Sequence, residues 1–319
     1  MFRLAHLSDP HVSPLPAVAP WALLNKRLLG YLSWQWRRRH VHRRAVLDAL
    51  TEDLRAQRPD HVAITGDLVN ISLPAEFEQA AHWLRDLGAP DWVTVIPGNH
   101  DAYVAMPWKA SWHHWRDYMS SDAACPKPGP PSDFADFPLV RRRGPLAIVG
   151  TSSALPTPLG FASGTLGQRQ LEALGSHLAA LEDEGCFRVV LVHHPPLEGS
   201  ATHRKRLSDA AEFRRVVAQS GAELVLHGHN HTFVTGEIEA EAGAIAVRGI
   251  PSASSLGHGH KPAANYQLFD IEPDAQGWRV TIRVRGYDPA TGRFEPAQEQ
   301  QLRVARPKGA AAPRNWASP

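Results

Sequence analysis

Short apolar runs alternate with longer amphipathic stretches between residues 3 and 226, and this alternation is the feature that most limits the fold. Six short runs are predicted strands: Arg3–Ser8, His61–Thr65, Trp92–Ile96, Leu146–Gly150, Arg188–Val192 and Glu223–Leu226. Four stretches have apolar residues at helical spacing and are predicted helices: Arg43–Gln57, Ala75–Leu87, Gln168–Leu181 and Asp209–Gln219. Strands that alternate with helices form βαβ units, so we expect an α/β domain built in layers.

The pattern changes after residue 231. Four further strands are predicted there, with no helices between them: Thr232–Ile238, Ala244–Arg248, Tyr266–Ile271 and Trp278–Arg285. The domain is expected to cover residues 1–290, with a helical insertion at about 14–44. Residues 291–319 are expected to form a C-terminal extension that is largely disordered, because its end is rich in Ala, Pro, Gly and basic residues.

Composition narrows the class of protein. The 319 residues are 43% hydrophobic, which is enough for a sizeable core. A net charge of +2 gives no indication of nucleic-acid binding, and two cysteines are too few for a disulfide framework. The N-terminus lacks a signal-peptide pattern and the chain lacks a long apolar run, so we expect a cytoplasmic protein, with peripheral contact to the inner membrane as an option.

Polar turns rich in Asp, His and Asn follow five of the predicted strands. They read Asp9-Pro10-His11, Gly66-Asp67, Gly98-Asn99-His100-Asp101, His193-His194-Pro195-Pro196 and Gly228-His229-Asn230-His231. In an open α/β sheet, functional groups gather outside the carboxyl ends of the strands. Any one turn alone is an ordinary turn sequence, but five in order predict a metal site with nitrogen and oxygen ligands.

The spacing within the turns also suggests how they work. In an extended segment, Asp9-x-His11 and His229-x-His231 would each place two side chains on the same side. Glycines before Asp67, Asn99 and His229 permit sharp turns, including positive φ. About eight donors are too many for one tetrahedral ion, so two ions roughly 3.5–4 Å apart that share a carboxylate fit better.

The ordered set of turns resembles the signature of the calcineurin-like metallophosphoesterases. Within that superfamily it is most similar to bacterial class III cyclic nucleotide phosphodiesterases and glycerophosphodiesterases. The matching motifs span residues 9 to 231. The resemblance implies a four-layer α/β/β/α sandwich with a binuclear metal centre at the strand ends.

The resemblance also implies a role for each residue. One metal ion would be held by Asp9, His11, Asp67 and His231, and the other by Asp67, Asn99, His193 and His229. A metal-bound hydroxide would attack the phosphorus. His100, oriented by Asp101, would donate to the phosphate or the leaving oxygen, and His194 would line the substrate pocket together with Asn99 and His100. The metals could be Fe, Mn, Zn or Co, and the sequence does not decide between them.

The insertion allows three interpretations. Trp21–His40 mixes Leu and Trp with clustered Arg and Lys, as in helices that lie on anionic lipid surfaces. Membrane contact through residues 21–44 is therefore one interpretation. A helical cap whose apolar face packs on the core, with solvated arginines, is the second, and a contact between copies of the chain is the third.

The function that the pattern favours is hydrolysis of small phosphodiesters, either cyclic nucleotides or glycerophosphodiesters. A membrane-surface hydrolase of a lipid-linked phosphoester or pyrophosphate, a phosphomonoesterase and a non-catalytic scaffold are the alternatives, and nucleic acid is the least favoured substrate. His203–Arg206 could bind a second phosphate or lie on the surface. Gly257–His260 is expected to be a flexible loop at the rim of the pocket.

Overall fold

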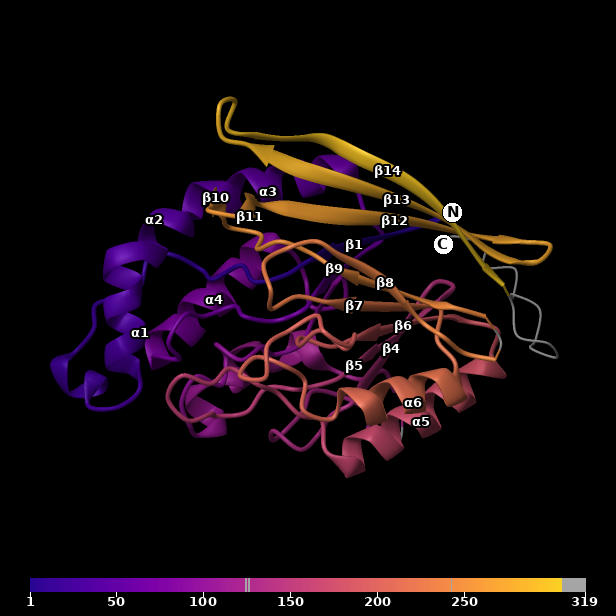
Figure 1. Ribbon diagram of the computed structural model, residues 1–319, viewed down its shortest axis with the longest axis horizontal. Helices are drawn as coiled ribbons and strands as arrows, with labels where there is room; N and C mark the ends of the chain where they lie inside the picture. Colours follow the sequence, from indigo (N-terminus) through magenta and orange to yellow (C-terminus); the bar gives the residue numbers. More distant parts are fainter. Residues whose placement is uncertain (124, 126, 242, 306–319) are drawn as a thin grey trace.

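The computed structural model of the protein describes residues 1–123, 125, 127–241 and 243–305. Within these residues the chain forms two six-stranded sheets that pack face to face (Figure 1). The first has the order β14 (Arg293–Ala305), β13 (Gly277–Asp288), β12 (Asn265–Asp274), β1 (Phe2–Leu7), β2 (His61–Ile64) and β3 (Val93–Val95). The second has the order β4 (Leu139–Arg143), β5 (Leu146–Gly150), β6 (Phe187–Leu191), β7 (Leu224–His227), β9 (Ile245–Gly249) and β8 (Val234–Ile238).

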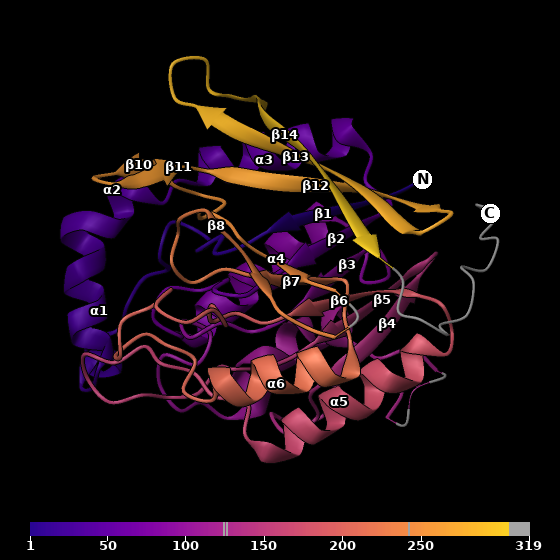
Figure 2. The ribbon, with the colours of Figure 1, turned by 45° about the vertical axis from the view of Figure 1, so that its right-hand side comes forward.

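Helices cover the outer face of each sheet. The predicted helices form as α3 (Arg44–Gln57), α4 (Pro74–Leu87), α5 (Gln168–Glu182) and α6 (Ala210–Ser220). Buried residues of α3 and α4 join the same core as β1, β2 and β3, whereas those of α5 and α6 pack on the second sheet. In Figure 2, α5 and α6 lie along one outer side of the molecule. The predicted α/β/β/α sandwich is confirmed.

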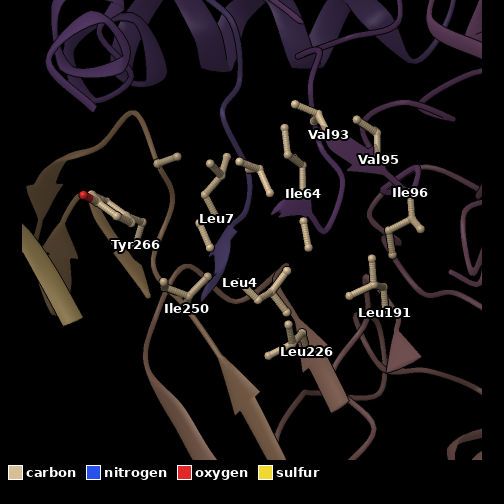
Figure 3. Close-up of a cluster of buried hydrophobic side chains, with 14 of the residues drawn as sticks. Leu4, Leu7, Ile64, Val93, Val95, Ile96, Leu191, Leu226, Ile250 and Tyr266 are labelled. Carbon is tan, nitrogen blue, oxygen red and sulfur yellow. The ribbon is translucent and has the colours of Figure 1, made fainter. Parts of the chain in front are cut away.

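The core between the sheets is formed by side chains that alternate along each strand. In β6, Val189 and Leu191 belong to the core shared by both sheets, while Val190 packs with α5 and α6 on the opposite face. Figure 3 shows Leu4 of β1 beside Leu226 of β7, so the two sheets meet directly. Strands buried on both faces are the reason why these runs are continuously apolar.

The C-terminal extension differs from the expectation. Residues 293–305 form β14, which pairs antiparallel with β13 and buries Phe294 and Val304 in the core. The strand was not predicted because it lies at a sheet edge, where most of its side chains are exposed and polar. Residues 306–319, where the expected disorder was centred, lie outside the described residues.

The insertion is helical, as expected. It consists of η1 (Pro20–Leu23), α1 (Arg27–Ser33), η2 (Trp34–Arg38) and α2 (Arg39–Val41), and it stands at the end of the sheets (Figure 1). The Arg27 guanidinium donates to the carbonyl oxygens of Ile71 and Ser72, which ties α1 to the loop after β2. A Cβ at Gly30 would collide with Ile71 and Tyr103, so glycine permits this close approach.

The insertion does not bury the apolar residues that a core-packed cap would bury. Trp34 is buried, but a set that we call the apolar face of the insertion is exposed: Trp21, Leu24, Leu28, Leu29 and Trp36. Trp21 is 75% exposed and Leu24 is 85% exposed. The expectation that the apolar side packs on the core is therefore wrong for these five residues, because the inward side of the segment carries Arg27 and Arg38 instead.

Within the described residues, each helix is too short or too polar to cross a membrane.

Replacing Leu191 with Ala is expected to destabilise the fold strongly. Leu191 is fully buried between the sheets, and loss of a buried leucine costs about 2–5 kcal/mol in free energy of unfolding. Urea denaturation measures this loss. Leu24→Ala, at an exposed position, serves as the matched control and should change the free energy of unfolding by less than about 0.5 kcal/mol. Equal losses in the two variants would contradict the assignment of Leu191 to the core.

Candidate metal centre

The five polar turns meet at one edge of the two sheets. Asp9 follows β1, Asp67 follows β2 and Asn99 follows β3, and these three strands run parallel. His193 follows β6 and His229 follows β7, which are parallel in the second sheet. Since the carboxyl ends of parallel strands lie at one edge, residues up to 222 positions apart become neighbours.

The first group of donors consists of Asp9, His11, Asp67 and His231. One ligand atom from each lies within 4.8 Å of the others. His231 Nε2 is 3.1 Å from Asp9 Oδ1 and 3.3 Å from His11 Nε2. The side chains of Asp9, His11 and Asp67 are almost fully buried. This group matches the first ligand set implied by the resemblance.

The second group shares Asp67 with the first. His193 Nε2 lies 3.4 Å from Asp67 Oδ2 and 3.1 Å from Asn99 Oδ1. Asn99 Oδ1 is in turn 2.7 Å from His229 Nδ1. Asp67, His193 and His229 form a second set that could hold a metal ion, with the Asn99 oxygen beside it.

The donors fit metal ions in spacing and in chemistry. Metal–ligand bonds of about 2.1 Å place neighbouring ligand atoms roughly 3 Å apart, which matches the distances above. His11 Nδ1 faces the carbonyl oxygen of Val69 at 3.0 Å, and His193 Nδ1 faces that of Thr65 at 2.6 Å. When Nδ1 carries the proton and donates it to the carbonyl, Nε2 is left as the metal-binding atom. These residues therefore fit a pair of ions.

The backbone at these turns is held in an unusual conformation. Among the described non-glycine residues, positive φ occurs at five members of the turns: Asp9, His11, Asp67, His229 and His231, with φ between 39° and 71°. Such angles are uncommon for L-residues and cluster at functional sites. The Asp-x-His and His-x-His pairs do converge, but the predicted extended geometry is wrong, because left-handed residues aim the side chains.

The glycines of the turns serve two different purposes. Gly66 has a φ of 92°, as expected for a sharp turn. Gly98 and Gly228 do not have positive φ. A Cβ at Gly98 would collide with Asp67, and a Cβ at Gly228 would collide with Ser8 and Asp9. These two glycines are needed because the ligand-bearing loops approach each other closely.

Burial and neighbouring charges set the protonation of the site. Burial lowers the pKa of His11 and His229 well below the ordinary value, so both rings are neutral. Burial acts against protonation of His193 as well, but the Asp67 carboxylate outweighs it and raises the pKa of His193 to about 9. Despite burial, the charge of His193 lowers the pKa of Asp67. Charged carboxylates among mostly neutral imidazoles form a donor set for metal ions.

His100 lies beside the donors and is not among them. Its Nδ1 is 2.5 Å from the carbonyl oxygen of Asn70, and its ring stacks on Tyr103 with centroids 5.5 Å apart. Burial and the nearby Arg38 charge lower the pKa of His100 to about 3. With Nδ1 bonded to Asn70, Nε2 is the ring nitrogen available for other interactions.

Asp101 does not contact the His100 ring, which differs from the expectation. Its carboxylate accepts backbone N–H groups of Asp67, Leu68, Val69 and Gly98 at 2.8–3.0 Å. Asp101 therefore holds together the two loops that carry Asp67 and Asn99. The sequence pointed to the adjacent side chain, but the buried carboxylate bonds the unpaired backbone donors of the turn instead.

His194 also differs from the expectation that it lines the pocket. It is fully buried, its Nδ1 is 2.7 Å from Ser153 Oγ, and its Nε2 is 3.1 Å from the carbonyl oxygen of Ala162. Its ring packs on that of His229, with centroids 4.5 Å apart. Because both ring nitrogens have protein partners, His194 supports the metal-site residues rather than contacting substrate.

Two residues of the insertion reach the site and were not predicted. The Arg38 guanidinium lies 3.1 Å from His11 Nδ1 and 3.3 Å from His100 Nδ1. His42 lies with its ring centroid 4.6 Å from that of His11 and contacts Ser254 Oγ at 2.9 Å. Neither follows a strand, so the strand-end pattern could not identify them.

A cavity of about 410 Å³ opens over the donors. Its floor includes Asp67, Asn99, His100, His229 and His231. The insertion and the loop at Leu159–Ala162 form its walls, and His258 lies at its rim. The Gly257–His260 segment was expected to be a flexible loop, but it belongs to a hairpin of β10 (Leu256–His258) and β11 (Lys261–Ala263). The volume suits a small molecule.

Comparison with known proteins agrees with this geometry. The profile of the Calcineurin-like phosphoesterase family matches residues 2–233. The chain is 26% identical over 238 residues to a probable cyclic nucleotide phosphodiesterase of Synechococcus sp., covering 73% of this chain and 80% of that protein. It is 27% identical over 194 residues to the glycerophosphodiester phosphodiesterase GpdQ of Enterobacter lignolyticus, covering 61% of this chain and 57% of that protein.

Solved structures show the same fold at low identity. A dimetal phosphatase from Danio rerio superposes with a TM-score of 0.55 at 12% identity, covering 96% of this chain and 99% of that one. Purple acid phosphatase PPD1 from yellow lupin gives a TM-score of 0.59 at 11% identity, covering 94% of this chain and 53% of that one. Since the family profile spans residues 2–233, the protein belongs to the calcineurin-like phosphoesterases and is a metal-dependent phosphoric ester hydrolase that uses two metal ions.

Proposed function

We propose that the protein hydrolyses small phosphodiesters, of the cyclic nucleotide or glycerophosphodiester type. The observation that carries this proposal is the position of Asp67 in both donor groups, with the ring of His100 beside them, its centroid 5.0 Å from that of His11. When bound, a pair of metal ions lowers the pKa of water and withdraws charge from the phosphoryl oxygens. Asp9, His11, Asp67 and His231 would hold one ion, and Asp67, Asn99, His193 and His229 the other.

Residues of the chain would supply the proton for the leaving oxygen, hold the loops of the site and add positive charge. His100 Nδ1 is occupied by Asn70, so a proton for the leaving oxygen would be held at Nε2. Although burial keeps the ring neutral on its own, a bound phosphate brings negative charge that favours a proton at this atom. Asp101 keeps the Asp67 and Asn99 loops at a constant separation, and Arg38 supplies a positive charge over the phosphate position.

A diester is favoured over a monoester for two reasons. The cavity extends well beyond the donor groups, which leaves room for a second alcohol arm. The similar proteins from Synechococcus sp. and Enterobacter lignolyticus bear the names of a cyclic nucleotide phosphodiesterase and a glycerophosphodiester phosphodiesterase. A cytoplasmic location stays a prediction.

The exposed apolar face of the insertion favours a second candidate, a hydrolase that works at an anionic lipid surface on a lipid-linked phosphoester. Trp21 in η1, Leu24 in the turn that follows and Leu28 in α1 are all exposed. Arg37 follows Trp36 directly and Arg39 comes three residues after it, so exposed cations lie near the apolar residues in the sequence, as in segments that bind anionic headgroups. Leu29 belongs to this face and also lines the cavity, so a lipid surface would lie at the mouth of the site.

The metal assignment predicts that Asp67→Ala loses the ability to bind two ions. The wild-type chain should bind about two Mn²⁺ per chain after dialysis, and the variant one or none, because Asp67 belongs to both donor groups. Elemental analysis by mass spectrometry gives the ratio. Asp117→Ala, at an exposed position, is the control, and circular dichroism checks that each variant folds. Two ions retained by Asp67→Ala would rule out a shared carboxylate.

The reaction assignment predicts metal-dependent cleavage of bis(4-nitrophenyl) phosphate, faster than that of 4-nitrophenyl phosphate and abolished by chelation. His100→Ala should lower kcat for the diester by about 10²- to 10⁴-fold with unchanged metal content, since it removes a proton donor. Release of 4-nitrophenolate measures both rates.

The control for this prediction is His113→Ala, because His113 lies in η4 (Trp112–Met119) away from the cavity. It should keep wild-type activity. If the protein hydrolysed only the monoester, it would be a phosphomonoesterase, and the diester assignment would be wrong.

The lipid-surface candidate predicts flotation with vesicles of anionic phosphatidylglycerol and not with phosphatidylcholine. The double variant Leu24→Glu/Trp36→Glu should lose the binding, because it places charge in the apolar face. If the wild-type chain does not float and light scattering instead gives the mass of a dimer that this variant disrupts, the face is a contact between copies of the chain.

A further inference from the structure

Four cations line the cavity, and one of them, Arg38, also lies beside the metal donors, 3.1 Å from His11 Nδ1. They are Arg37, Arg38, Lys205 and Lys261, and among the described residues that line the cavity Asp67 is the one acidic side chain. The Asp67 carboxylate belongs to the metal donors and attracts Arg38, but within the described residues it forms no ion pair with Arg37, Lys205 or Lys261. This part of the cavity is therefore strongly positive.

Three separate segments bring the cations together. Arg37 and Arg38 end η2, and Lys261 begins β11. An antiparallel bridge between His42 and Ser255 holds the hairpin against the insertion, and Figures 1 and 2 both show β10 and β11 beside α2.

Lys205 belongs to the third segment. The carbonyl oxygens of Arg204 and Arg206 accept the N–H groups of Ala162 and Gly164 at 2.8 and 3.1 Å. These bonds lay the 204–206 segment along the loop that forms one wall, and Lys205, which lies between them, lines the cavity. The fold therefore brings these cations together from three segments that are far apart in the sequence.

The cations lack acidic partners. Within the part of the chain that the structure describes, ion pairs form at Arg142, Arg188 and Arg285, among others, but not at these four residues. The nitrogens that Arg38 approaches on His11 and His100 already face the carbonyl oxygens of Val69 and Asn70. If those nitrogens donate to the carbonyls, they cannot accept from Arg38, and the other nitrogen that Arg38 approaches, His11 Nε2 at 3.4 Å, is a candidate metal ligand.

Lys26 differs from these four cations in its hydrogen bonds. It also lines the cavity, but its ammonium group donates to the carbonyl oxygens of Thr157 and Phe161 and to the Thr157 hydroxyl. It therefore serves the wall itself. Partial burial lowers the pKa of Lys261, and the charges of Lys205, Arg37 and Arg38 lower it further, against the opposing effect of the Asp9 carboxylate.

We infer that this wall is a subsite for a second anionic group, a phosphate or carboxylate carried on one alcohol arm of the substrate. Cations held together without acidic partners repel one another, and a bound anion relieves that repulsion while accepting charge-assisted hydrogen bonds. The inference rests on the proposed function and narrows its substrate class. Cyclic nucleotides, which carry a single phosphate charge, leave the subsite unused, whereas a diester with a further phosphate or carboxylate fills it.

The experiment compares two matched diesters, 4-carboxyphenyl 4-nitrophenyl phosphate and the methyl ester of its carboxylate. Both release 4-nitrophenolate and differ by one charge. The Mn²⁺-loaded wild-type protein should show a kcat/KM about tenfold higher for the carboxylate, and Lys205→Gln/Lys261→Gln should lose this preference. Its kcat/KM for the methyl ester should stay unchanged, since the substituted residues lie away from the donors.

Lys109→Gln, in η3 (Trp108–Ala110) and outside the cavity lining, is the control and should keep the preference. Equal loss on both diesters, or a preference that survives the double substitution, would overturn the subsite while leaving the proposed function intact.

Absence of turnover on both diesters would contradict the proposed function instead, and binding then tests the subsite by itself. Isothermal titration calorimetry with 4-carboxybenzylphosphonate and its carboxylate methyl ester requires no reaction. The acid should bind the wild-type protein and Lys109→Gln more tightly than the ester, and the double variant should bind both equally. Equal affinities in the wild-type protein would refute the subsite.

Discussion

The buried carboxylate of Asp67 is the constraint on which the rest of the site depends. A charge removed from water is stable only where opposite charge or hydrogen bonds replace the lost hydration. Asp67 obtains this from the His100 backbone N–H at 2.7 Å, from His193, and from the metal ions of the family. The two loops that carry Asp67 and Asn99 are then held at the necessary distance by Asp101.

Two parts of the molecule form the site: the two sheets and the insertion after β1. The strand ends of the two sheets supply the proposed metal ligands, and the packing of Leu4 against Leu226 keeps those ends together. The insertion after β1 supplies the surroundings of the site: Arg38 over the donors, Leu29 at the mouth and Arg37 on the charged wall. The sheets carry the residues of the family's motifs, and we propose that the insertion helps to select which phosphoesters can enter.

The sequence was informative where a local pattern had a single physical solution. Apolar strands followed by Asp, His or Asn at the strand ends predicted both the layers and the donors. It was less informative where contacts are made between distant segments. Asp101 adjoins His100 in the chain but bonds the loop of Asp67, and His194 turns away from the cavity. The mostly polar strand β14 went unrecognised, because an edge strand needs few apolar residues.

What the sequence by itself determined is the type of fold and the identity of the donors, since periodicity and residue chemistry are local properties of the chain. Only the tertiary structure decided that the donor residues have left-handed backbone angles, and that Arg37, Lys205 and Lys261 line one cavity. The same holds for the exposure of Trp21 and Leu24. The reason is that proximity and burial arise from the packing of segments far apart in the sequence, and spacing along the chain carries no record of that packing.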